Sequence, residues 1–326
     1  GAQDELIYDG ETFIMNSSGA IIAYLNSFIE DKIIVDINSK ETKNFSTLSD
    51  EESTYKALVL GLRDYFHKTN HSDAVIGLSG GIDSALVCCL AVEALGHKNV
   101  HGISMPSKYS SEHSLNDAKK LARNLRIDYK VISIKELVQE YDDTLFELFL
   151  GLESDETEQN IQSRIRGNIL MALSNKFGWM VLSTGNKTEL ALGYCTLYGD
   201  MSGGLSVISD LSKKEVYSLS NWINKKYPQR IPSNTLTKIP SAELIEDQVD
   251  PFDYDIVSPL VDELVGGLKT RSELISSGFD SNLIDQISAL IRLNEFKRRQ
   301  SAPGLKISRK AFGIGRRIPI VNKYKG

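Results

Sequence analysis

Residues 73–96, DAVIGLSGGIDSALVCCLAVEALG, contain a glycine-rich turn with one acidic side chain between two apolar runs. A phosphate-binding loop of the G-x-x-x-x-G-K-[ST] type, aligned on residues 77–84, would have a lysine where this chain has Asp83. A carboxylate at that position repels a polyphosphate unless a cation lies between them. Because Mg²⁺ commonly binds one or two carboxylates together with phosphate oxygens, we interpret Asp83 as a metal ligand in an ATP site.

The backbone of this loop suits a phosphate ligand. Gly80 and Gly81 permit positive φ and close approach of N–H groups, and the start of the following helix adds a partial positive charge. Ser79 and Ser84 add hydroxyl donors. The alternative is a tight turn in which Asp83 only stabilises the helix N-terminus. The residues expected to contact ATP are Gly77, Leu78, Ser79, Gly80, Gly81, Ile82, Asp83 and Ser84.

Strand-like and helical segments alternate around this loop. Apolar runs typical of buried strands occur at 74–79, 100–105, 129–134 and 179–184, and segments of helical length occur at 51–68, 83–95, 111–125 and 158–178. This alternation predicts right-handed βαβ units and an α/β fold with a doubly wound parallel sheet. Residues beyond 211 are expected to be mostly helical. Ligands of such sheets bind at the carboxyl ends of the strands, where the loop is expected to lie.

The first residues have a different character. Short apolar or alternating runs at 5–10, 11–19, 20–28 and 31–37 are separated by turn sequences and predict β structure. The polar residues 38–50 are typical of a linker. We therefore divide the chain after residue 44 into a short β segment with its linker and an α/β domain of residues 45–326.

Composition limits the possible ligands and surroundings. The 326 residues carry a net charge of −6, so no general affinity for nucleic acid is expected, and an anionic ligand must be held locally. No apolar run approaches the roughly 18 residues of a membrane span, so no membrane partner is expected. Cys88, Cys89 and Cys195 form no C-x-x-C pair, which disfavours zinc and disulfides and is typical of the reducing cytoplasm. Cys88 and Cys89 are expected to pack in the core.

The loop SGGIDS resembles that of the ATP pyrophosphatases, which adenylate a substrate oxygen, release pyrophosphate and then admit a nucleophile. Residues 181–200, VLSTGNKTELALGYCTLYGD, resemble a segment of the NAD synthetases within this group. The resemblance implies that Thr184 contacts ATP, that Glu189 is a second metal ligand, and that Asp200 lies where ammonia arrives. Asp83 and Glu189 both follow expected strand ends, so they could share one Mg²⁺. A capped helix start is the alternative interpretation of TGNKTE alone.

Two other segments imply contacts with deamido-NAD. Residues 160–172, NIQSRIRGNILMA, resemble the dinucleotide-binding helix of NAD synthetases, which implies that Asn160 and Arg164 on one helical face contact deamido-NAD. The resemblance also implies that Glu189 contacts deamido-NAD. An exposed amphipathic helix is the alternative. Near the end, NEFKRRQ resembles the glutamine-dependent members in particular and implies that Lys297 contacts deamido-NAD.

Further ATP contacts are implied by the segments SDLSKKEVYSLSNWI and PSAEL. In the first, Lys213 corresponds to a lysine that neutralises an ATP phosphate. In the second, Ser241 corresponds to a residue near ATP. The catalytic set implied by the resemblance is therefore Asp83, Glu189, Asp200 and Lys213.

The first residues carry a resemblance of their own. The element QDEL and the residues after it resemble the end of a nitrilase-type glutaminase domain, so residues 1–44 are expected to be its C-terminal remnant plus a linker. The nucleophilic cysteine of such domains lies upstream of this element, and no residue here matches their catalytic triad. We therefore expect this chain to use ammonia, whereas the parent enzymes use glutamine. Leu197 and Gly204 replace a lysine and an acid of the small ammonia-dependent members, as in the glutamine-dependent branch.

The resemblance implies ATP-dependent amidation of deamido-NAD to NAD through an acyl-adenylate, with release of AMP and pyrophosphate and with Mg²⁺ as cofactor. It also implies a homodimer or a larger assembly. Two alternatives remain at this point. A tRNA-modifying ATP pyrophosphatase should have cysteine pairs and a basic surface, and a nucleotide-binding module without catalysis should have lost some of the charged residues named above.

Overall fold

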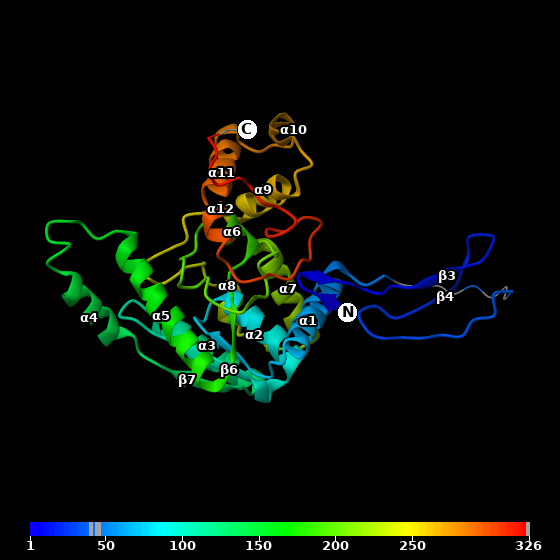
Figure 1. The fold of residues 1–326 in the computed structure, drawn as a ribbon, viewed down its shortest axis with the longest axis horizontal. Helices are drawn as coiled ribbons and strands as arrows, with labels where there is room; N and C mark the ends of the chain where they lie inside the picture. The colour runs from blue at the N-terminus through cyan, green and yellow to red at the C-terminus, as the bar shows by residue number, and fades with distance from the viewer. Residues whose placement is uncertain (39–41, 43–46, 324–326) are drawn as a thin grey trace.

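A parallel sheet lies at the centre of the computed structural model, which describes residues 1–38, 42 and 47–323 (Figure 1). Its strand order is β7-β6-β5-β8-β9, and every pairing is parallel. The strands are β5 (Ala74–Gly77), β6 (Val100–Ser104), β7 (Asp128–Val131), β8 (Met180–Ser183) and β9 (Leu205–Ser206). The chain winds outward from β5 to β7 and then crosses back to β8, so the strand order reverses between β5 and β8. This topology confirms the predicted doubly wound sheet.

Helices cover both faces of this sheet, because successive residues of β5 point to opposite faces and are buried on both. Ala74 and Ile76 pack into a core with α1 (Asp50–Lys68), α2 (Ile82–Leu95), α3 (Glu112–Leu125) and α7 (Lys213–Lys226). Val75 faces the opposite core, which is shared with α4 (Lys135–Leu145) and α5 (Glu156–Phe177). Cys88 and Cys89 are fully buried in the first core, as predicted. A short 3-10 helix, His97–Asn99, precedes β6.

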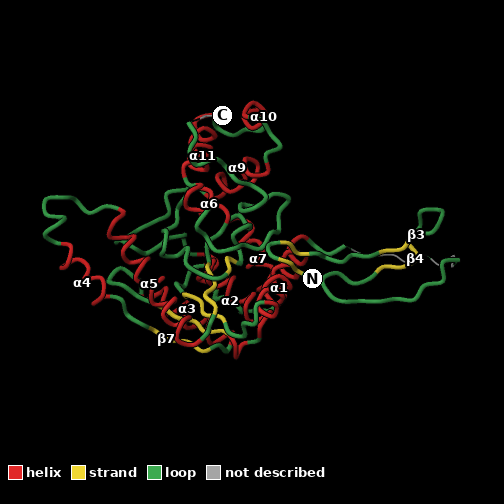
Figure 2. The backbone as a smooth tube through the Cα atoms, in the orientation of Figure 1, coloured by secondary structure: helices red, strands yellow, loops and turns green. Residues whose placement is uncertain are grey.

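The C-terminal part is mostly helical, as predicted, and forms a second group beside the sheet (Figure 2). Its core is built from α6, α9, α10 and α11. The bounds are α6 (Lys187–Leu192), α8 (Ser233–Thr237), α9 (Tyr254–Gly266), α10 (Arg271–Ser276), α11 (Ser281–Leu293) and α12 (Glu295–Arg298). Among the described residues no helix combines the length and apolarity needed to cross a bilayer.

The N-terminal residues form two small antiparallel pairs, β1 (Ala2–Gln3) with β2 (Leu6–Ile7) and β3 (Phe13–Met15) with β4 (Ile21–Tyr24). The first pair lies on α1, where the amide of Ala2 donates to Asp64 at 2.7 Å. The second extends away from the rest of the molecule in Figure 1.

One predicted strand of the N-terminal segment is wrong. The run at 31–37 is irregular, and Ile34 is fully exposed. No described strand lies beside it to complete a ladder. The proposed division after residue 44 lies outside the described residues.

Candidate active site

A cavity of about 740 Å³ opens at the carboxyl ends of β5, β6 and β8. This is the edge of the sheet at which the strand order reverses, the expected ligand position in a doubly wound fold. Its walls come from the SGGIDS loop, one face of α5, residues 193–200 and residues 238–251. The predicted ATP contacts Thr184 and Ser241 both line it.

The SGGIDS loop closes one end of the cavity, and its shape depends on a glycine. Gly80 has φ of +83°, and a Cβ there would overlap the backbone of Ser114 in α3. The amide of Gly81 donates to Ser79 Oγ at 3.1 Å, and Ser84 Oγ donates to the Gly81 carbonyl at 3.0 Å. No side chain caps the start of α2, so its first N–H groups are free for a ligand. Gly80 and Ser84, also predicted to contact ATP, do not line the cavity. The loop residues that line it are Gly77, Leu78, Ser79, Gly81, Ile82 and Asp83.

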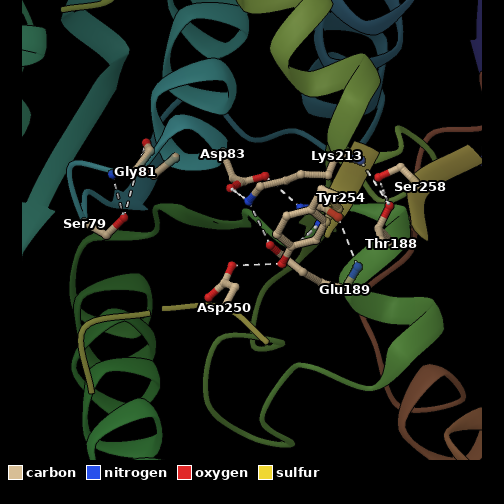
Figure 3. A network of polar contacts seen from close by, with 11 residues as sticks. Ser79, Gly81, Asp83, Thr188, Glu189, Lys213, Asp250, Tyr254 and Ser258 are labelled. Atoms are coloured by element: carbon tan, nitrogen blue, oxygen red, sulfur yellow. Dashed lines mark hydrogen bonds and ion pairs between the residues drawn. The ribbon is translucent and has the colours of Figure 1, made fainter. Parts of the chain in front are cut away.

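Asp83 and Glu189 line the cavity, and Lys213 lies between them (Figure 3). Asn186 also contacts both carboxylates. Lys213 Nζ lies 2.6 Å from Asp83 Oδ2 and 3.1 Å from Glu189 Oε1. Asn186 Nδ2 donates to Asp83 Oδ1 at 2.8 Å, and the Asn186 amide donates to Glu189 Oε2 at 3.4 Å. Every oxygen of the two carboxylates therefore has a partner within the chain. We call these four residues the carboxylate ring.

Local sequence explains how the ring is held. Asn186 is the N-cap of α6 and forms a capping box with Glu189, so the alternative interpretation of TGNKTE is correct as local structure and compatible with a place in the cavity wall. The amide of Lys213 donates to Thr188 Oγ1 at 3.1 Å, and Thr188 Oγ1 donates to Ser258 Oγ at 3.2 Å. The starts of α6, α7 and α9 are thereby fixed against one another.

Burial sets the charge balance of the ring. It raises the pKa of the Glu189 carboxyl to about 7. The positive charge of Lys213 lowers this pKa, and the negative charge of Asp83 raises it further. Burial alone would lower the pKa of Lys213, but the Asp83 and Glu189 carboxylates raise it above its usual value. The lysine is only 3% exposed and stays protonated at neutral pH.

The donor set fits one Mg²⁺. Asp83 and Glu189 supply two hard oxygen ligands at one place, next to a loop suited to phosphate. Among the described residues, no group of three histidine, cysteine or acidic side chains forms a metal cage. Mg²⁺ commonly takes one or two protein carboxylates and completes its coordination with phosphate and water, so these two carboxylates suffice for the fit.

Sequence reasoning missed three residues in or near the site: Arg166 and Asp250 line the cavity, and Tyr254 lies next to Lys213 of the carboxylate ring. The ring of Tyr254 lies 5.3 Å from Lys213 Nζ, and its hydroxyl donates to Asp250 Oδ2 at 2.8 Å (Figure 3). Arg166 lines the cavity and donates from Nε to the Met105 carbonyl at 3.0 Å, and burial lowers its pKa to about 10. Neither Asp250 nor Tyr254 belongs to a recognisable motif, whereas the helical face of Asn160, Ser163 and Gly167 could have indicated Arg166.

Asp200 also lines the cavity. Its Oδ1 accepts from the Thr196 amide at 2.7 Å and from Ser163 Oγ at 3.0 Å, and burial raises the pKa of its carboxyl. Cys195 also lines the cavity, but burial raises the pKa of its thiol to about 12. Cys195 is therefore a neutral thiol at neutral pH.

Of the four residues predicted to contact deamido-NAD, Glu189 belongs to the carboxylate ring, and the other three hold the segment 193–200. Asn160 Oδ1 accepts from Thr196 Oγ1 at 2.7 Å, and Arg164 Nε donates to the Leu197 carbonyl at 3.2 Å. Lys297 Nζ donates to the carbonyls of Gly193 and Cys195, each at 2.8 Å. Asn160 and Lys297 line the cavity, whereas Arg164 is exposed beside it.

Comparison with known proteins identifies this arrangement. The family model described as NAD synthase matches residues 54–301, which include the loop and the whole carboxylate ring. The chain belongs to the NAD synthase family. The part matched by the family is the α/β domain and most of the helical group, so the residues before α1 lie outside it.

Similar NAD synthase family members include two proteins named glutamine-dependent NAD(+) synthetase. The one from Synechocystis is 47% identical over 333 residues, with 99% of this chain and 60% of that protein covered. The one from Thermotoga maritima is 41% identical and covers 100% of this chain and 64% of that protein. This chain thus spans less than two thirds of the length of these relatives.

Solved structures of two NAD synthetases are similar to this chain. The glutamine-dependent NAD+ synthetase from Acinetobacter baumannii, solved in complex with ADP, is 36% identical with a TM-score of 0.67, covering 99% of this chain and 60% of that one. The NH3-dependent NAD synthetase from Campylobacter jejuni is 27% identical with a TM-score of 0.63, covering 76% of this chain and 96% of that one.

Proposed function

We propose that this chain catalyses the ATP-dependent amidation of deamido-NAD to NAD, with release of AMP and pyrophosphate. The observation that carries this proposal is the carboxylate ring, in which Asp83 and Glu189 converge on Lys213 directly beside the SGGIDS loop. Membership of the NAD synthase family and the printed names of its relatives support it.

In the first step the nicotinate carboxylate oxygen of deamido-NAD forms a bond to the α-phosphorus of ATP, and the bond to the departing pyrophosphate breaks. The free N–H groups at the start of α2 and the hydroxyl of Ser79 hold the pyrophosphate. Asp83 and Glu189 would hold Mg²⁺, which neutralises phosphate charge when bound. Lys213 adds a positive charge, and Thr184 and Ser241 contact the nucleotide.

In the second step ammonia attacks the acyl carbon of the adenylate and AMP leaves with its electron pair. Asp200 receives the proton that the attacking nitrogen loses, because its buried carboxyl has a raised pKa and therefore binds a proton more readily than an exposed one. Asn160, Arg164 and Lys297 shape the wall against which deamido-NAD lies, through their bonds to residues 193–197.

We propose ammonia as the nitrogen source for these 326 residues. Glutamine hydrolysis of the nitrilase type needs a cysteine thiolate, and none of the three thiols suits that role. Burial raises the pKa of Cys88, Cys89 and Cys195 far above neutrality. Three free thiols also fit a cytoplasmic location, where thiols stay reduced.

We also propose a homodimer or a larger assembly. Apolar side chains between α4 and α5 are strongly exposed, with Leu148 at 75%, Leu150 at 73% and Leu152 at 71%. Several strongly exposed apolar side chains so close in the sequence favour burial in a protein interface. Light scattering after size-exclusion chromatography should give at least twice the chain mass, and replacement of these three leucines by serine should lower it. A monomer at micromolar concentration would contradict the proposal.

The activity is tested by mixing the protein with Mg²⁺, ATP and deamido-NAD, with either ammonium or glutamine, and measuring AMP and NAD. We expect equal amounts of AMP and NAD with ammonium and neither product with glutamine. Equal rates with the two nitrogen sources would contradict the ammonia proposal. No AMP with either source would favour a nucleotide-binding module without catalysis, and ADP instead of AMP would exclude the proposed chemistry.

A further inference from the structure

The carboxylate ring contains its own cation. Lys213 contacts one oxygen of Asp83 and one of Glu189, while Asn186 occupies the other oxygen of each. In the described part of the chain no second lysine or arginine pairs with either carboxylate. The proposed magnesium ligands are thus already fully engaged by groups of the protein.

The Lys213 ammonium and a divalent cation bound to both carboxylates would occupy overlapping positions. Nζ lies within 3.1 Å of both carboxylates, so a metal ion bound to both oxygens would come within repulsive distance of it. The Lys213 side chain is 4% exposed and those of Asp83 and Glu189 are 18% and 17% exposed. Water screens little of this repulsion, because the site is largely buried.

We propose that Lys213 is an internal counter-ion that competes with the divalent cation for Asp83 and Glu189. The metal binds both carboxylates well only when the phosphates of the nucleotide draw the ammonium away. The metal ion and the phosphate–lysine contact therefore assist each other, and by linkage each raises the affinity of the site for the other. This inference rests on the metal site of the proposed function and adds a second role for Lys213 besides neutralising phosphate.

The surroundings of Lys213 allow its side chain to move while its backbone stays in place. Its amide is bound to Thr188, and the first turn of α7 is held by the capping box of Ser212 and Glu215. Beyond the carboxylates the ammonium faces the ring of Tyr254, which Asp250 holds by its hydroxyl. An aromatic face stabilises an ammonium that has left its carboxylate partners, so the lysine need not enter water.

Binding of Mn²⁺ in the absence of nucleotide tests this inference. Titration calorimetry at one fixed pH compares the unmodified protein with Lys213→Met, Lys214→Met and Asp83→Asn. Lys214 is the matched control, because it is the next residue of α7, carries the same charge and is exposed. We expect Lys213→Met to bind Mn²⁺ more tightly by about tenfold or more, Lys214→Met to bind as the unmodified protein does, and Asp83→Asn to lose binding.

The outcomes separate the two proposals. Unchanged binding by Asp83→Asn would contradict the metal site itself and, with it, the proposed function. Loss of binding by Asp83→Asn together with unchanged or weaker binding by Lys213→Met would overturn the counter-ion role alone.

A second measurement needs no variant and guards against misfolding of Lys213→Met. Trace acetylation of the unmodified protein, read by mass spectrometry, reports how accessible each amine is. Saturating Mn²⁺ should raise the reactivity of Lys213, because its ammonium loses both partners, and should leave that of Lys214 unchanged. Equal reactivity of Lys213 with and without Mn²⁺ would contradict the proposal.

Discussion

Asn186 Nδ2 donates a 2.8 Å hydrogen bond to Asp83 Oδ1, although the two residues follow different strands of the sheet. Asp83 is in the first turn of α2 after β5, and Asn186 caps α6 after β8. The contact therefore spans the point at which the strand order reverses. It fixes Asp83 beside Glu189, which lies three residues after Asn186, and Lys213 at the start of α7 completes the carboxylate ring.

Asp83→Asn should remove catalysis with little effect on folding. The substitution keeps the hydrogen bond to Asn186 but removes one of two carboxylates proposed for Mg²⁺, so pyrophosphate release should fall by about a hundredfold or more. Asp143→Asn is the control and should keep full activity, because Asp143 is exposed on α4 and accepts a hydrogen bond from Gln139 far from the ring in sequence. Normal pyrophosphate release by Asp83→Asn, with a fold confirmed by circular dichroism, would contradict the metal role.

Glu189 should make the stability of the fold depend on pH. Burial raises its pKa from the usual 4.5 to about 7, so between these values the folded chain holds a proton that the unfolded chain has lost. The free energy of unfolding should therefore fall as pH rises through this range. Relative to Glu189→Gln, which cannot titrate, we expect the unmodified protein to lose about 1–3 kcal/mol. Urea unfolding of both proteins on either side of this range measures it, and a parallel pH dependence of the two would show that Glu189 does not titrate there.

Gly80→Ala should be more damaging than Gly96→Ala, although the two glycines have nearly equal φ of +83° and +84°. A Cβ at Gly96 meets no atom within 4 Å, so only backbone strain of about 1–2 kcal/mol is expected. A Cβ at Gly80 also overlaps the Ser114 backbone, with Cα only 2.9 Å away. Thermal unfolding should show a larger loss for Gly80→Ala, and its KM for ATP should rise. Equal losses of thermal stability in the two variants would mean that the SGGIDS loop can move away from α3.

Cys195→Ser should keep ammonia-dependent activity within about threefold. The thiol lines the cavity but its raised pKa, about 12, leaves it uncharged and without a nucleophilic role. Rates of AMP formation for the two proteins test this, with iodoacetamide treatment of the unmodified protein as an independent check on thiol chemistry. Loss of activity by more than tenfold in Cys195→Ser would indicate a catalytic thiol and favour a thiolating enzyme.

Sequence reasoning reached the sheet and the loop because both are encoded locally. Apolar runs of strand length and the SGGIDS turn predict β5 and α2 with their bounds almost unchanged. The expected strand at 129–134 is shorter, because the neighbouring chain reaches Pro106, which has no N–H to continue the ladder. Local patterns thus fix most elements, whereas pairing across the sheet fixes their ends.

Site residues that come together from distant parts of the chain were harder to predict. Asp83, Glu189 and Lys213 were predicted from segments that resemble known ones, and the structure brings them together. Asn186 was overlooked because a helix cap gives no sign that its side chain also reaches Asp83 from another loop. Tyr254 enters the site through the packing of α9 on α6 and α7, which no local pattern encodes.

The central claim, activation of deamido-NAD as an acyl-adenylate, is tested most directly by following one oxygen atom. Deamido-NAD labelled with oxygen-18 in its nicotinate carboxylate is converted with ATP, Mg²⁺ and ammonium, and the products are analysed by mass spectrometry. The account predicts that each AMP formed carries one labelled oxygen from the carboxylate, because the bond to the α-phosphorus forms there and the acyl carbon–oxygen bond later breaks. AMP without label, or label in released phosphate, would contradict it.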